Sequence, residues 1–568
     1  MASTELSEPR INVGPEASSV YCPLEPNQIR FLTILPALCL SDEICCDLRT
    51  VALGDEAVAS YEALSYTWNS MELSCRISVN NYTLMVTANL YEALRHLRGT
   101  ENPRTLWVDA LCINQHNMAE RNVQVLLMGK IYSTVRQVII WLGTDVEDVD
   151  AGLRVLAERA PKLSTEEIRA NIGTLFERQW WYRSWVVQEF LNAQERIFVC
   201  GSITLSFNTM RLIWDAISRF NDWYMYMHIY NLLGAMNTAK SSKLRDVMLD
   251  FGHCLATDPR DKVYAYLNLA KDISTVIPDY TASIQRVYTD FAKTYIKEEG
   301  NLEIICTHHR GYNSINLPSW VPDWSICRRA VQNWTVNSQV QSIFSAGYRP
   351  GSRSGQRLPS AGLISFEDTQ SLLISGILIG KVSEAARSLD PSWFDTSDWV
   401  VGLRSWKPKD VETSTYLNGE SKFSAFCCTI ITDSTGFLRF SGNFGMLSSL
   451  EDEVLKALSG AATSNLSRLS ALLRRSTYSS RFARLSDGHF ALIPNASEIG
   501  DDVCIVLGCS TPMILRKNSS YPLAGGLPKN SSSGVSVSGT YQMIGPCYVH
   551  GVMDGEMATQ TSKLFEIV

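Results

Sequence analysis

The sequence lacks the spacings that usually mark a metal site or a disulfide framework. Its 568 residues include only eight histidines, and no HExxH motif occurs. Its fifteen cysteines form no CxxC pair. An odd number of scattered cysteines is typical of reduced thiols in an intracellular protein. We therefore expect no metal, and we interpret His308-His309 as an exposed loop pair.

The common phosphate-binding and nucleophile motifs are also missing. There is no GxGxxG and no GxSxG, so the sequence offers no standard dinucleotide loop and no nucleophile elbow. The stretch 376–382, GILIGKV, resembles a P-loop, but only three residues separate its glycines and no Ser or Thr follows Lys381. We interpret it as an apolar strand and expect that no cofactor is required.

Neither excess basic charge nor a long apolar run is present. The net charge is −7, which disfavours nucleic acid and anionic lipid as partners. The apolar run 31–40 is interrupted by Pro36 and falls short of the roughly 20 residues that a membrane span needs. The N-terminus lacks the basic flank and apolar stretch of a secretory signal. We expect a cytoplasmic protein with no membrane span and no nucleic-acid partner.

The pattern near the N-terminus predicts a sheet with a β-hairpin. Residues 62–68 predict a short buried strand, and 76–86 predict a hairpin that turns at Asn80-Asn81. Residues 88–98 predict an amphipathic helix, with Leu90, Leu94 and Leu97 on one face.

A strand, a helix and a strand then follow in order, at 106–110, 119–135 and 138–142. Such a βαβ unit predicts parallel strands joined by a crossover helix. Its expected buried stripe is Val123, Leu127, Ile131 and Val135. Ligands of open parallel sheets bind at the carboxyl ends of the strands, which points to Asp109 and to 143–145.

The predicted secondary structure of the remaining two thirds of the chain changes twice. Residues 207–300 predict helices, with Asp258 as an N-cap, Pro259 at the first helical position and Asp261 in the first turn. A Gly/Ser/Pro/Arg-rich stretch at 345–362 predicts a linker or loop. Short apolar stretches separated by turn residues then predict a β-rich region, including LLISGILIGKV, GFLRFSG and HFALIP. Two Ser-rich stretches, 458–480 and 518–538, are expected to be exposed insertions.

The segment 178–190, RQWWYRSWVVQEF, carries the most conspicuous side chains. In a helix, Trp181, Trp185 and Glu189 would share one face. Burial beside indoles would raise the pKa of the Glu189 carboxyl, and Arg183 or Arg121 would lower it. Two interpretations follow: a carboxylate placed for chemistry, or core tryptophans with Glu189 as an ion-paired anchor.

Three segments, 61–69, 106–143 and 178–190, together resemble the HET (heterokaryon incompatibility) domain of filamentous fungi. The matching residues are Tyr61, Glu62, Ala63, Leu64, Ser65, Tyr66, Trp68, Trp107, Asp109, Ala110, Cys112, Ile113, Asn114, Gln115, Glu120, Arg121, Trp141, Leu142, Gly143, Arg178, Trp180 or Trp181, Arg183, Trp185, Gln188 and Glu189. Weaker likeness continues through ATDPRDKVYAYLNLA, IPDYT, LPSWVPDWS and YVHGVMDGE.

This resemblance implies an α/β domain followed by regions of other kinds. The expected parts are an N-terminal arm at 1–50, a HET domain at 51–205, a helical region at 206–344, the linker at 345–362 and a β-rich region at 363–568. HET domains are distantly similar to TIR domains, so a flavodoxin-like parallel sheet with helices and an added β-hairpin is expected.

The TIR likeness also implies chemistry. Enzymatic TIR domains cleave the nicotinamide-ribose bond of NAD with a glutamate that corresponds to Glu189, which makes NAD the expected substrate. Glu189, Asp109 and Ser65 are the catalytic candidates, and Trp68, Trp185 and Arg183 are the candidates for substrate contact. A carboxylate suits this reaction because it stabilises an oxocarbenium-like state.

The implied function is non-self recognition that triggers cell death or growth arrest when an incompatible protein partner or allele product is met. A non-enzymatic module that self-associates is the alternative from another class. Glycan hydrolysis is a weaker alternative function, because no motif places the second carboxylate that this reaction needs.

Overall fold

The computed structural model describes residues 20–54, 61–68, 72–144, 175–217, 243–270, 275–307, 315–326, 345–347, 370–396, 398–432, 444–459, 467–477, 479–518, 537–557 and 560–568, with single positions 155, 164, 229, 232, 233 and 366. The chain forms two compact units, Met1–Ala282 and Ser283–Val568.

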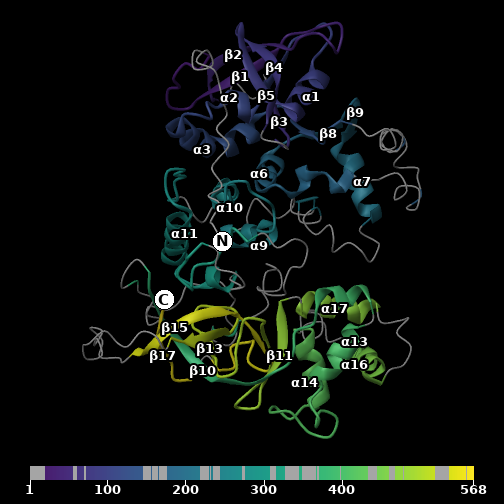
Figure 1. Ribbon diagram of the computed structural model, residues 1–568, viewed down its shortest axis with the longest axis vertical. Coiled ribbons are helices and arrows are strands. Elements are labelled where there is room, and N and C mark those ends of the chain that lie inside the picture. The colour runs from purple at the N-terminus through teal and green to yellow at the C-terminus, as the bar shows by residue number, and fades with distance from the viewer. Residues whose placement is uncertain are drawn as a thin grey trace, which may run out of the picture. The chain divides into compact units, whose positions relative to one another are not determined.

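The first unit is built on a mixed sheet of nine described strands (Figure 1). Their order is β5-β4-β2-β1-β6-β3-β7-β8-β9. The bounds are β1 Gln28–Ile34, β2 Cys45–Ala52, β3 Glu62–Ser65, β4 Leu73–Val79, β5 Tyr82–Thr87, β6 Arg104–Trp107, β7 Val138–Trp141, β8 Arg196–Cys200 and β9 Ile203–Ser206.

Four neighbouring strands, β6, β3, β7 and β8, run parallel. Strands β3 and β7 are buried at every position, as expected where helices cover both faces of a parallel sheet. The expected parallel strands on either side of a helix are confirmed, with β3 inserted between β6 and β7. Because parallel strands end at the same side, the carboxyl ends of β6, β3 and β7 form one edge, here called the carboxyl edge.

The predicted hairpin and first helix are confirmed. Asn80 and Asn81 both have positive φ, 51° and 66°, which is the backbone that a two-residue hairpin turn requires. Helix α1, Ala88–Leu97, begins at the N-cap Thr87, whose side chain accepts a hydrogen bond from the Leu90 amide. The predicted apolar face of α1 is buried.

Helix α3, Met118–Thr134, forms where it is expected but buries a different face. Val123 is 50% exposed, whereas Gln124 is buried and its amide donates to the Gln28 carbonyl at 2.9 Å. The predicted stripe is wrong at this end because α3 packs on helix α6, Ser184–Asn192, and on the 3₁₀ turn Leu267–Leu269, and the sequence pattern within α3 does not reveal these partners.

Part of the expected N-terminal arm lies inside this sheet. Strands β1 and β2 pair along their whole lengths, and β1 also pairs with β6. The apolar run that begins at Phe31 is thus a buried strand followed by a turn in which Leu38 is 83% exposed. None of the helices in the described part of the chain combines the length and apolar character that a membrane crossing demands.

Helices complete the first unit after β9. They are α7 Phe207–Ile217, α9 Leu244–Phe251 and the short α10 Asp261–Tyr264. The expected cap is displaced: α10 begins at Asp261, and the Asp258 carboxylate instead accepts from the Arg260 amide and pairs with its guanidinium at 2.7 Å. The helical character of this region is confirmed.

The second unit begins with helix α11, Ile284–Glu299, and contains a sheet of eight described strands. The order is β13-β14-β15-β17-β10-β11-β12-β16, and a further pairing of β10 with β13 closes five strands into a ring. The bounds are β10 Leu372–Ala385, β11 Ser480–Leu485, β12 Phe490–Pro494, β13 Asp502–Val506, β14 Met513–Lys517, β15 Val537–Pro546, β16 Tyr548–Val549 and β17 Lys563–Ile567. The β-rich character is confirmed, and the P-loop-like stretch 376–382 is part of strand β10.

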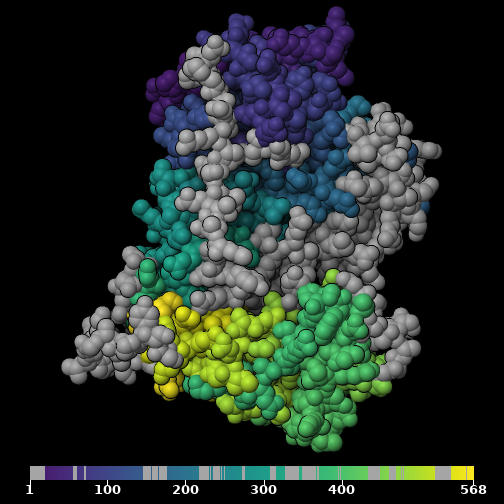
Figure 2. All heavy atoms as spheres, viewed as in Figure 1, coloured from purple at the N-terminus to yellow at the C-terminus, as the bar shows by residue number. Residues whose placement is uncertain are grey.

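Helices pack beside β11 and β12, which the sequence patterns did not predict (Figure 1). They are α13 Trp399–Trp406, α14 Lys422–Ile430, α16 Phe444–Ser459 and α17 Ser467–Thr477. Part of the Ser-rich stretch 458–480 is therefore α17, with Leu469 and Leu473 in the core, and not an exposed insertion. From β10 to β17 the described atoms form one packed body (Figure 2). Residues 308–314, 348–365, 433–443 and 519–536 lie outside the described set, and so do the expected histidine pair, most of the linker, GFLRFSG and most of 518–538.

Candidate functional site

A hydrogen-bonded chain of three buried side chains lies at the carboxyl end of β3. The Trp180 indole donates to the Ser65 hydroxyl oxygen at 2.8 Å, and the Ser65 hydroxyl donates to Glu189 Oε2 at 2.5 Å. An indole N–H can only donate, so the Ser65 oxygen is the acceptor of that bond and its own proton points to the carboxylate. Ser65 comes from β3 and Glu189 from α6, Ser184–Asn192.

Asp109 forms a second cluster at the same edge, two residues after β6. Its carboxylate accepts from the Trp68 indole at 3.2 Å and from the Ala110 amide at 2.8 Å, and it is hydrogen-bonded to Tyr66. The side chain opens the short helix α2, Asp109–Cys112, where a carboxylate is favoured by the helix dipole. Thus adjacent strand ends supply Ser65, Tyr66 and Trp68 from β3 and Asp109 from β6.

The loop after β3 is held from both sides. The Arg183 guanidinium donates to the Tyr66 carbonyl. Asn89 of α1 donates to the Thr67 carbonyl at 2.6 Å and accepts from the Trp141 indole at 3.0 Å, which joins the loop to β7. These bonds fix the backbone that carries the candidate side chains.

Burial dominates the electrostatics of the two carboxyls. It raises the pKa of Glu189 to about 7, against an opposing effect of the Arg183 charge and the Ser65 hydrogen bond. Burial likewise raises the pKa of Asp109, and Arg183 again opposes the shift. Among the described residues Arg183 makes no direct ion pair with Glu189, whose one hydrogen-bond donor is Ser65. The contacts of Glu189 therefore differ from those expected of a carboxylate that is anchored by an ion pair.

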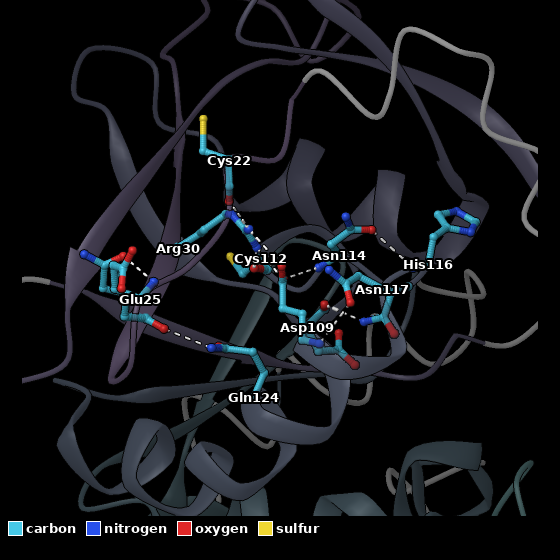
Figure 3. A network of polar contacts seen from close by, with 12 residues as sticks. Cys22, Glu25, Arg30, Asp109, Cys112, Asn114, His116, Asn117 and Gln124 are labelled. Carbon is cyan, nitrogen blue, oxygen red and sulfur yellow. Dashed lines mark hydrogen bonds and ion pairs between the residues drawn. The ribbon is translucent and has the colours of Figure 1, made fainter. Parts of the chain in front are cut away.

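A buried ion pair organises the loop that follows Asp109. Arg30 donates to both carboxylate oxygens of Glu120, at 2.6 and 3.1 Å, and to the Cys112 carbonyl at 3.0 Å (Figure 3). Glu120 also accepts from the Asn114 amide at 2.8 Å, and Gln115 donates to the Asp109 carbonyl at 2.9 Å. These bonds lock the backbone around Asp109.

Arg30 is a residue that sequence reasoning missed. It lies 90 positions before Glu120 in an apolar strand, and its guanidinium is buried. A lone arginine inside an apolar run was the available signal, because such a charge needs a buried partner.

The segment 178–190 is not one helix. Residues Gln179–Tyr182 form a 3₁₀ turn and α6 starts at Ser184, because Arg183 is extended and bridges to Leu255. Trp181 consequently packs on Phe198, with ring centroids 5.7 Å apart, and does not share a helical face with Glu189. The predicted continuous face is wrong for this reason.

Trp185 is directed to another carboxyl. Its side chain is hydrogen-bonded to Asp261, which also accepts from the Tyr280 hydroxyl at 2.5 Å. Burial, followed by the nearby Asp258 charge, raises the pKa of Asp261 to about 6. The structure therefore brings Ser65, Trp68, Asp109, Arg183 and Glu189 to the carboxyl edge, and places Trp185 against α10.

Access to the site differs among its members. Ser65, Tyr66, Trp180 and Glu189 are buried, with Glu189 only 4% exposed, whereas Trp68, Asp109 and Arg183 are half-buried. Within the described ranges no group of three His, Cys, Asp or Glu side chains is arranged to hold a metal ion. Trp68, Asp109 and Arg183 are therefore the members of the site with the larger solvent-exposed surface.

The raised pKa of Glu189 predicts a pH-dependent stability difference between the wild-type chain and Glu189→Gln. Between its ordinary pKa of 4.5 and its folded pKa of about 7, Glu189 stays protonated when folded but ionises when unfolded. Rising pH over this window therefore destabilises the wild-type fold, by up to about 3 kcal/mol at pH 8.

Glutamine does not titrate, so the unfolding free energy of the wild-type chain minus that of Glu189→Gln should fall from pH 5 to pH 8. Urea unfolding followed by tryptophan fluorescence measures it. An equal difference at both pH values would show that Glu189 ionises normally.

The comparisons with known proteins concern the segment that contains this site. Residues 61–189 match the family described as heterokaryon incompatibility protein (HET). Heterokaryon incompatibility protein 6, OR allele, of Neurospora crassa is 28% identical over 396 residues, which cover 52% of this chain and 58% of the relative. The chain thus spans little more than half the length of that relative. No solved structure matches. Residues 61–189 therefore form a heterokaryon incompatibility (HET) domain, and Ser65, Asp109 and Glu189 all lie within it.

Proposed function

We propose that this protein acts in heterokaryon incompatibility in a filamentous fungus, and that its HET domain arrests growth by hydrolysing NAD to nicotinamide and ADP-ribose. The observation that carries the proposal is the buried Ser65–Glu189 pair at the carboxyl edge, with the pKa of Glu189 raised to about 7. Perturbed carboxyls that meet at strand ends are typical of sites that do chemistry.

In the proposed reaction, water adds to C1′ of the nicotinamide ribose while the bond from C1′ to nicotinamide breaks. The bonding electron pair leaves with nicotinamide, and the water proton is released. The transition state carries positive charge on the ribose, which the Glu189 carboxylate stabilises. Ser65 holds Oε2 of that carboxylate, which leaves Oε1 to face the ribose.

The other members of the edge would bind and position the substrate. Trp68 and Arg183 are half-buried, and an indole face and a guanidinium plane both suit stacking on an aromatic base. Glu189 is 4% exposed, so in this proposal the side chains that cover it move aside when the substrate enters. Trp185 supports α6 through Asp261 and has no substrate contact in this proposal.

Overexpression in fungal cells tests this proposal. The wild-type chain should stop growth and deplete NAD, and Glu189→Gln should do neither although it accumulates to the same level. Glu195→Gln is the matched control, since Glu195 is an exposed glutamate six positions further along; it should behave as wild type. Growth arrest that persists in Glu189→Gln with NAD unchanged would overturn the proposal.

A second candidate function is favoured by the burial of Glu189. A carboxyl that is 4% exposed and hydrogen-bonded to Ser65 also suits a closed, non-enzymatic domain that self-associates or binds an incompatible allele product. This candidate predicts growth arrest without NAD loss in the wild-type chain, so the same overexpression experiment separates the two.

A further inference from the structure

One guanidinium at the carboxyl edge has almost no protein partner. Nε and Nη2 of Arg178 are buried without a hydrogen bond among the described residues, and Nη1 makes one long bond of 3.5 Å to the Thr144 carbonyl. No described carboxylate forms an ion pair with it. Arg178 as a whole is half-buried, but guanidinium nitrogens that are buried without a hydrogen bond are costly and usually mark a place where another group binds.

The position of Arg178 is defined by β7. Its Nη1 lies 3.5 Å from the point where a Cβ on Gly143 would stand, and Gly143 follows β7 by two residues. Gly143 has a φ of 105°, a backbone conformation that side chains other than glycine's rarely adopt. The guanidinium therefore lies against bare backbone at the end of β7.

The same short segment also reaches the Glu189 cluster. Trp180, two residues after Arg178, donates to Ser65 at the end of β3, the neighbour of β7. Two residues span at most roughly 7 Å of chain, and neighbouring strands lie about 4.8 Å apart. Arg178 and Glu189 are thus close enough for one small molecule to contact both.

We propose that Arg178 binds the diphosphate of a dinucleotide whose ribose lies at Glu189. A guanidinium matches two phosphate oxygens at once, and the end of a parallel strand beside a glycine lets a phosphate approach the backbone closely. This inference rests on the proposed function for the identity of the ribose. It adds the residue that recognises the diphosphate of that substrate.

Calorimetric titration of the full chain tests the site with three probes: inorganic phosphate, pyrophosphate and ADP-ribose. Wild type should bind ADP-ribose more tightly than pyrophosphate, and pyrophosphate more tightly than phosphate. Arg178→Gln should weaken pyrophosphate and ADP-ribose by at least about tenfold, the equivalent of one lost charge-assisted bond. The affinities of Arg178→Lys should lie between those of the wild type and Arg178→Gln, because lysine keeps the positive charge but cannot donate two parallel hydrogen bonds as a guanidinium does.

Arg49→Gln serves as the control. Arg49 is exposed on β2, its pairing with Asp47 spans 3.8 Å, and it is remote from β7 in the strand order. Its binding curves should match those of the wild type.

Thermal stability provides a second readout that guards against misfolding. Because Arg178 has so few partners, Arg178→Gln without ligand should melt roughly 2–4 °C above the wild type. Pyrophosphate should then raise the melting temperature of the wild type but not that of Arg178→Gln. A variant that melts lower without ligand, or that binds pyrophosphate like the wild type, would overturn the assignment.

The failure of this inference is distinguishable from the failure of the proposed function. Glu189→Gln should retain ADP-ribose binding, since it keeps Arg178. If the wild-type chain binds ADP-ribose through Arg178 yet leaves NAD intact, the anion site stands and the hydrolase function fails. If NAD is cleaved with equal efficiency by wild type and Arg178→Gln, the hydrolase function stands and this site fails.

Discussion

A purified chain carrying Glu189→Gln is expected to release nicotinamide from NAD at least roughly a thousandfold more slowly than the wild-type chain. Glutamine fills the same space and can still accept the Ser65 hydrogen bond, so the fold is retained. It carries no charge to stabilise the cationic ribose. The loss should therefore appear in kcat with little change in KM, as for an interaction made in the transition state.

Chromatographic separation of NAD, nicotinamide and ADP-ribose measures this rate. Ser65→Ala is a useful second variant, because it removes the hydrogen bond to Oε2 of Glu189 but keeps the carboxylate. Its rate of nicotinamide release should be about tenfold lower than that of the wild type. Glu195→Gln should keep the wild-type rate. Equal rates in Glu189→Gln and the wild-type chain would assign the chemistry elsewhere.

A chain cut after residue 205, where the α/β pattern ends, is expected to be unfolded, whereas Met1–Ala282 should fold. The β-strand-like bridge between Arg183 and Leu255 closes the start of α6. Asn268 donates to the Gln188 carboxamide at 3.3 Å, and a Cβ on Gly129 would lie 2.6 Å from Asn268. Leu255 and Asn268 are thus packed directly on α6 and α3.

Further contacts bind the same region. Arg121 lies over the Tyr280 ring at 3.9 Å, the Tyr280 amide donates to Asn122 at 3.3 Å, and Trp185 is hydrogen-bonded to Asp261. Each lost contact costs about 1 kcal/mol, and the exposed apolar surfaces of α3 and α6 add to this. The sum is comparable with the whole stability of an ordinary domain, about 5–15 kcal/mol.

Circular dichroism and thermal melting of the two truncated chains decide this prediction. Met1–Ala282 should melt cooperatively, and the chain that ends at 205 should show no transition. A cooperative transition in the shorter chain would mean that the HET domain is complete without residues 206–282.

Local patterns predicted the elements whose stabilising contacts are local. The Asn80-Asn81 turn and α1 depend on neighbours a few residues away, and both form as expected. The meeting of Asp109 and Ser65 at one edge could also be anticipated, because parallel strands end on the same side.

The features that the sequence did not reveal depend on distant partners. The buried Gln124 donates a hydrogen bond to Gln28 of β1, 96 positions earlier in the sequence, and Trp185 is hydrogen-bonded to Asp261, 76 positions later. The α6 boundary depends on Leu255. No period within a short window carries such information, because each contact requires knowing which segment packs alongside.

The pH dependence of NAD cleavage by the wild-type chain tests the central claim most directly, since it reports the ionisation of the catalytic group in the free enzyme. With the pKa of Glu189 raised to about 7 and the carboxylate as the active form, kcat/KM should rise about tenfold per pH unit below 7 and level off above it. A profile that is flat between pH 5 and pH 8, or no nicotinamide release at any pH from the folded chain, would contradict the assignment of Glu189 as the catalytic carboxylate.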